Sequence, residues 1–126
     1  MQKAAVGLAA FLGSAGATHF IAPSFYDVLV PRVLPGPRRA WTIVSGIAEL
    51  VCAALIARPR TRRLGATLAF GLFIAVFPGN VQMAVDWRDE PLLRRLIAYG
   101  RLPLQIPLLI WAWRVRQSAS SPHTTR

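Results

Sequence analysis

The chain has 126 residues, of which 54% are hydrophobic, and it combines a mean hydropathy of +0.42 with a formal net charge of +10. A soluble domain of this length has too small a core to bury so much apolar surface. The basic residues lie at the ends of apolar blocks, and no DNA- or RNA-reading pattern accompanies them, so the charge argues against a nucleic-acid partner and for a lipid bilayer.

The apolar blocks predict an all-α fold, a four-helix transmembrane bundle with spans at 4–22, 40–57, 64–85 and about 96–115. Each block approaches the ~20 residues that cross a ~30 Å hydrocarbon layer. Lys3 and the small residues at 15–17 leave a cleaved signal peptide as the alternative for the first block. We expect residues 1–116 to form the membrane domain and the Ser/Thr-rich residues 117–126 to form a disordered cytoplasmic tail.

The connections between the blocks carry the topological signals. Residues 23–39 contain four prolines and several apolar side chains, which predicts a short interfacial segment between the first two spans. Residues 58–63 contain four arginines in a tight turn, and the positive-inside rule therefore places both termini in the cytoplasm. Within the first span, Ala5, Ala9, Gly13 and Ala17 recur every four residues and predict a face for close helix packing.

Pro78 interrupts the third block. The fourteen residues 64–77 are too few to cross a membrane, so the helix is expected to continue past Pro78 with the carbonyl of Ile74 freed. Asn80 would then satisfy the loosened backbone locally or line a pocket that the kink opens.

Five polar side chains within the predicted spans fall in the half of the bundle opposite the termini, while the other half is almost purely apolar. Their depth predicts a ligand-binding pocket lined by His19, Glu49, Asn80, Arg101 and Gln105. Three alternatives remain for Glu49: an ion pair with Arg101, a protonated and hydrogen-bonded carboxyl, or a proton site. Arg101 has the alternative of reaching the headgroups, and His19 that of an interfacial hydrogen bond.

Several motifs in order carry a family resemblance. They are His19-Phe-Ile-Ala-Pro-Ser-Phe25, Val30-Pro-Arg-Val-Leu-Pro-Gly-Pro37, Ser45-Gly-Ile-Ala-Glu49, Pro59-Arg-Thr-Arg-Arg63, Val76-Phe-Pro-Gly-Asn-Val-Gln-Met83 and Tyr99-Gly-Arg-Leu-Pro-Leu-Gln105. Together they resemble the DoxX family of small bacterial membrane proteins. The resemblance implies a four-helix bundle in the bacterial plasma membrane, and an association with quinone-linked sulfur oxidation or redox-stress complexes.

These observations favour an accessory or ligand-binding subunit of a membrane redox system. Its ligand would be a quinone or a lipid, and its partner a membrane or peripheral oxidoreductase. One cysteine, Cys52, and two histidines exclude an internal disulfide, a CxxC relay and a metal cluster, so no intrinsic cofactor and no independent catalysis are expected. The alternatives are a small proton-coupled transporter that uses Glu49, or a structural assembly protein; a homo-oligomer is compatible with each.

Overall fold

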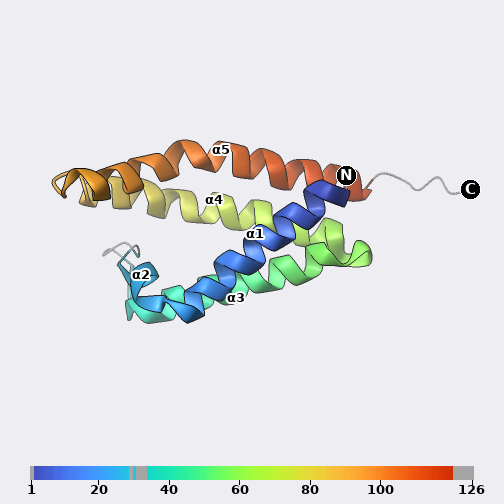
Figure 1. The fold of residues 1–126 in the computed structure, drawn as a ribbon, viewed down its shortest axis with the longest axis horizontal. Coiled ribbons are helices and arrows are strands. Elements are labelled where there is room, and N and C mark those ends of the chain that lie inside the picture. Colours follow the sequence, from blue (N-terminus) through green and yellow to red (C-terminus); the bar gives the residue numbers. More distant parts are fainter. Residues whose placement is uncertain (1, 29, 31–33, 121–126) are drawn as a thin grey trace, which may run out of the picture.

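The computed structural model describes residues 2–28, 30 and 34–120, and this part of the chain is helical with no strand. The elements are α1 (Gln2–Ile21), α2 (Pro23–Asp27), α3 (Arg38–Ala57), the 3₁₀ turn η1 (Pro59–Thr61), α4 (Arg62–Asp86) and α5 (Leu92–Ser120) (Figure 1). The all-α prediction is confirmed. The four long helices contain the four predicted blocks almost completely, and the short α2 lies in the connection that was expected to hold an interfacial segment.

Three of the predicted spans are helices long and apolar enough to cross a membrane: Lys3–Ile21, Arg38–Ala57 and Pro59–Asp86. The fourth, in α5, has the length but is not among the helices that are apolar enough; its 29 residues include five arginines. α5 also continues to Ser120, so the disorder predicted from residue 117 is wrong for residues 117–120. The rest of the predicted tail, residues 121–126, lies outside the described residues, and the division at residue 116 stays a prediction.

Proline marks most of the helix boundaries. Pro23 is the first residue of α2, Pro37 precedes α3, Pro59 begins η1 and Pro91 precedes α5. Each position suits a residue that lacks an N–H and has a fixed φ, because the first turn of a helix leaves that donor without a partner anyway.

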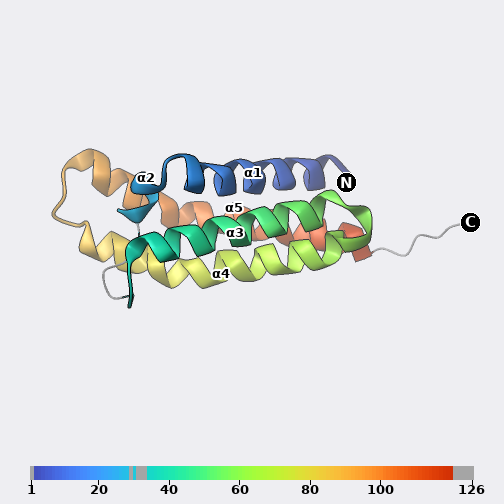
Figure 2. The same cartoon turned by 90° about the horizontal axis from the view of Figure 1, so that it is seen from below.

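The long helices form two pairs. α1 packs along α3, α4 packs along α5, and contacts between α3 and α4 join the pairs. Figure 1 shows that the pairs converge at the end that holds the N-terminus, η1 and the end of α5, and diverge towards α2. In the view of Figure 2 all four helices follow the long axis of the molecule.

The main apolar core lies at the converging end. Its buried members come from the start of α1 and α4 and from the end of α3 and α5: Ala5, Leu8, Leu12, Cys52, Ala53, Ile56, Ala66, Ala69, Phe73, Ala112 and Val115. Only a smaller cluster of Met83, Ala84 and Ala98 lies between α4 and α5 towards the other end. The apolar half expected from the sequence is therefore the packed half, and the polar side chains belong to the half where the pairs separate.

α1 and α3 approach closely at two glycines. A Cβ atom on Gly46 would lie 2.7 Å from His19 Cβ and 3.3 Å from the carbonyl oxygen of Gly16. Two residues of the predicted small-residue face do pack at the core: Ala5 is buried in it and Ala9 packs against it. The predicted face did not include Gly16, which lies at this crossing. This crossing holds the last turn of α1, which contains His19, against α3.

Candidate functional site

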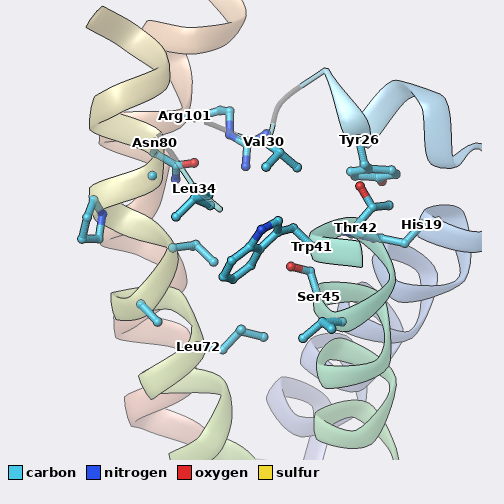
Figure 3. Close-up of a pocket in the computed structure, with 15 residues that line it drawn as sticks. His19, Tyr26, Val30, Leu34, Trp41, Thr42, Ser45, Leu72, Asn80 and Arg101 are labelled. Carbon is cyan, nitrogen blue, oxygen red and sulfur yellow. The ribbon is translucent and has the colours of Figure 1, made fainter. Parts of the chain in front are cut away.

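A cavity of about 410 Å³ opens between α3 and α4 where the helix pairs diverge (Figure 3). The end of α1, the segment after it and one residue of α5 complete the lining. The lining residues are His19, Tyr26, Val30, Leu34, Trp41, Thr42, Val44, Ser45, Leu72, Ala75, Val76, Pro78, Gly79, Asn80 and Arg101. The structure thus brings three of the five predicted pocket residues, His19, Asn80 and Arg101, to one cavity, while Glu49 and Gln105 lie behind its wall.

His19 lies in the last turn of α1, is 7% exposed and has two partners at one ring nitrogen. Nδ1 is 2.6 Å from the Ala15 carbonyl oxygen and 3.3 Å from Glu49 Oε1. Because a carbonyl only accepts, Nδ1 carries a hydrogen. The ring also stacks on Tyr26 with centroids 3.7 Å apart. No hydrogen bond within the described residues engages Nε2, so this is the ring nitrogen that remains for a ligand.

Glu49 pairs with His19 and not with Arg101. Its Oε1 is buried and lacks a hydrogen bond within the described part of the chain, and its only ion-pair contact there is the 3.3 Å approach to His19. Arg101 acts on it only as a more distant charge. The ion pair with Arg101, one of the three alternatives, is therefore wrong: α5 packs on α4, which puts Arg101 across the cavity from α3.

Arg101 projects from α5 beside Asn80, opposite Tyr26 and His19 (Figure 3). Among the described residues it has neither a hydrogen bond nor an ion pair within 4 Å. Five other arginines, by contrast, each have a polar partner in the chain: Arg39, Arg62, Arg88, Arg94 and Arg116. The guanidinium of Arg101 thus faces the cavity with all its donors unused.

Asn80 and Gln105 form a buried hydrogen-bonded group beside Pro78. Asn80 Nδ2 donates to Gln105 Oε1 over 3.3 Å, and Gln105 Nε2 donates to the carbonyl of Phe73. α4 continues through Pro78, as predicted. The side chain that bonds the helix backbone here is Gln105 from α5, however, and it bonds the carbonyl of Phe73, one residue before the Ile74 carbonyl that Pro78 frees. Gln105 therefore supports Asn80 and α4 from behind the cavity wall.

The sequence interpretation missed the role of α2. Tyr26 covers His19, and its hydroxyl donates to Thr18 Oγ1 over 2.6 Å, because the hydrogen of Thr18 is committed to the Ala15 carbonyl. Asp27 accepts hydrogen bonds from Thr42 Oγ1 at 2.7 Å and Arg39 Nε at 2.9 Å. The hydrogen bond from Thr42 holds the pKa of Asp27 below its usual value; partial desolvation opposes this shift, and the nearby Arg39 and Arg38 add smaller contributions that lower the pKa.

The cavity wall on α3 was also missed, although a signal was present. Thr42, Ser45 and Glu49 follow i, i+3, i+7 spacing and share one face of α3, and the first two line the cavity. Trp41 projects towards α4 between the two helix pairs, with its Nε1 donating to the Pro35 carbonyl over 2.7 Å (Figure 3). Extending the polar face of Glu49 by two turns would have identified Thr42.

The site offers one permanent cation, one imidazole and several hydroxyl and amide groups. No group of three His, Cys, Asp or Glu side chains suited to a metal ion occurs within residues 2–28, 30 and 34–120. The chemistry that these side chains can perform is recognition of a polar head, with apolar walls for the rest of a ligand.

Residues 8–116 match the family model described as Domain of unknown function (DUF8561). Comparisons with curated proteins and with solved structures found no match. The resemblance to the DoxX family is therefore wrong, and its implied link to sulfur oxidation and redox stress falls with it. The chain belongs to the family Domain of unknown function (DUF8561).

Proposed function

We propose that this chain is an integral membrane protein that binds a lipophilic molecule with a polar head, a quinone or a lipid, in the cavity between α3 and α4. The observation that carries the proposal is the cavity itself. It has the size of a small-molecule site, mostly apolar walls, and a few polar groups gathered on it.

The surface of the bundle supports a lipid environment. Large apolar side chains are exposed on all four long helices, among them Val6 at 62%, Val44 at 59%, Leu68 at 44% and Ile106 at 61%. A monomeric soluble protein rarely exposes so much contiguous apolar surface. Three long helices have the length and composition to cross a bilayer, and we propose that α5 crosses beside them with its terminal arginines at headgroup depth.

The orientation follows from charge. Exposed arginines occur at both ends of the bundle, but at the converging end three of them, Arg58, Arg60 and Arg63, lie within six residues around η1, with Arg114 near the end of α5. We propose that this end and both termini face the cytoplasm of a bacterial cell, with the cavity in the outer leaflet.

The proposal is confined to ligand binding. A role in a redox complex depended on the DoxX resemblance and has no remaining support. A proton-coupled carrier and a purely structural subunit are the competing functions. A measurement of ligand binding distinguishes the proposed function from the structural one.

The test is a cavity-filling variant with a matched control. Ala75 on α4 lines the cavity, whereas Ala54 on α3 is exposed and does not, so Ala75→Phe fills the site and Ala54→Phe adds the same ring elsewhere. Native mass spectrometry would follow binding of decylubiquinone and of a phospholipid to each purified variant.

We expect wild type and Ala54→Phe to retain a stoichiometric ligand and Ala75→Phe to lose it. If the wild-type protein binds neither probe, or if Ala75→Phe binds as well as wild type, the cavity is not the site and the structural function is favoured.

A further inference from the structure

We infer that the cavity selects a ligand whose head is an anion, a carboxylate or a phosphate. The inference rests on the proposed function, since it names the class of ligand that the same cavity takes. It follows from the charges that face the cavity and from the partners that those charges lack.

The first step is the unused cation. Arg101 is nine residues from the start of α5, or about 13.5 Å along the helix axis, so it is well within the bundle. Its guanidinium lines the cavity and has no hydrogen bond or ion pair within 4 Å in the described part of the chain. A guanidinium has five N–H donors in a planar fork that matches carboxylate and phosphate oxygens.

The second step is the absence of a competing carboxylate. No Asp or Glu is among the residues that line the cavity. Glu49 lies behind His19, 3.3 Å from its Nδ1, and both oxygens of Asp27 are occupied by Thr42 and Arg39. The described wall therefore carries positive charge without a facing negative group, and an apolar surround strengthens that field.

The third step concerns the other free groups. Within the described residues, the Ser45 hydroxyl has no hydrogen-bond partner and one N–H of Asn80 is unused, so both can donate to a ligand. The acceptors on the wall are fewer: the free amide oxygen of Asn80 and His19 Nε2 in its neutral form. An excess of donors around one cation suits a head that is rich in acceptor oxygens.

A neutral quinone satisfies only part of this set. Its carbonyl oxygens accept hydrogen bonds but bring no charge opposite to that of Arg101, which has Glu49 only as a more distant counter-charge. A carboxylate or phosphate supplies both the acceptors and the opposite charge, and charge-assisted bonds of this kind are about twice as strong as neutral ones.

The test compares two probes that differ only in charge. The spin label of 16-doxyl stearic acid quenches tryptophan fluorescence, and Trp41 lines the cavity. Its methyl ester has the same chain and label without the carboxylate. Binding of both to the protein in uncharged detergent would be measured for wild type, Arg101→Gln, Arg101→Lys and the control Arg88→Gln. Arg88 is also at the diverging end but outside the cavity, and its side chain is 66% exposed.

For wild type we expect the acid to bind at least roughly tenfold more tightly than the ester. Arg101→Gln should abolish this preference, Arg101→Lys should keep part of it, and Arg88→Gln should keep all of it. Circular dichroism of each variant confirms folding, and the lysine variant keeps the test valid if the glutamine variant unfolds. Displacement of the acid by oleate or by oleoyl lysophosphatidic acid then distinguishes carboxylate from phosphate, and displacement by either one supports the inference.

Equal binding of acid and ester to wild type would overturn the inference while leaving the proposed function intact, provided that Ala75→Phe weakens both. Equal losses in Arg101→Gln and Arg88→Gln would also overturn it, because net charge alone would then explain the preference. Failure of the acid, the ester and decylubiquinone to bind at all would overturn the proposed function as well.

Discussion

The close crossing of α1 and α3 can be tested by placing a single methyl group at Gly46. A Cβ atom there would lie 2.7 Å from His19 Cβ and 2.9 Å from the Phe20 ring, distances at which real Cβ atoms are essentially never found. The Gly16 carbonyl at 3.3 Å closes the third side. Gly46→Ala therefore forces α1 away from α3, and such overpacking costs about 1–3 kcal/mol.

Helix propensity acts in the opposite direction. Replacing glycine with alanine inside a helix gains up to about 1 kcal/mol, so the net effect at Gly46 is about 0–2 kcal/mol of destabilisation. Gly71 on α4 provides the control, because a Cβ atom there would meet nothing within 4 Å. Gly71→Ala should gain the propensity without the clash, and the difference between the two variants isolates the clash at about 1–3 kcal/mol.

The assay is equilibrium unfolding in mixed detergent micelles, followed by circular dichroism, for wild type and both variants. Gly46→Ala should unfold at a lower denaturant fraction than Gly71→Ala. Equal stability of the two alanine variants would refute the argument, because α1 and α3 would then have to be farther apart at this crossing than the structure places them.

Two further predictions concern the supports of the cavity. The pKa of Asp27 is lowered from its usual value of 3.8, so its bond to Thr42 contributes stability above that pH, and this contribution is lost as pH falls through the lower folded-state pKa. Below about pH 4 the free energy of unfolding of Asp27→Asn should therefore fall less steeply with pH than that of wild type. Equal dependence of the free energy of unfolding on pH in the two proteins would contradict this. Gln105→Ala removes the buried hydrogen bonds to the Phe73 carbonyl and to the amide of Asn80, and should destabilise the bundle by about 1–3 kcal/mol in the same unfolding assay. The control Gln82→Ala removes only a pair with a residue four positions on and should cost no more than about 0.5 kcal/mol, so equal effects would contradict a supporting role for Gln105.

The positions of the helices could be read from the sequence because local chemistry sets them. Prolines 23, 37, 59 and 91 lie at or just before the first residue of a helical element, and long apolar blocks lie between them. The i, i+4 pair of Gln82 with Asp86 was likewise predictable, since both side chains lie on one helix. The distribution of polar residues along the predicted spans also distinguished an apolar half of the bundle from a polar half, and the main packed core lies in the apolar half.

Partners across helices were decided only by the tertiary structure. Depth along the membrane placed Glu49 and Arg101 at a similar level, but α1 packs on α3 and α5 on α4, so Glu49 contacts His19 and Arg101 faces it across a cavity. Which helices pair, and how each is rotated, depends on long-range contacts such as the Gly16–Gly46 crossing, and a one-dimensional pattern does not specify them. The sequence alone therefore determined which polar groups belong to one half of the bundle, and the tertiary structure decided which of them are satisfied by each other and which remain open to a ligand.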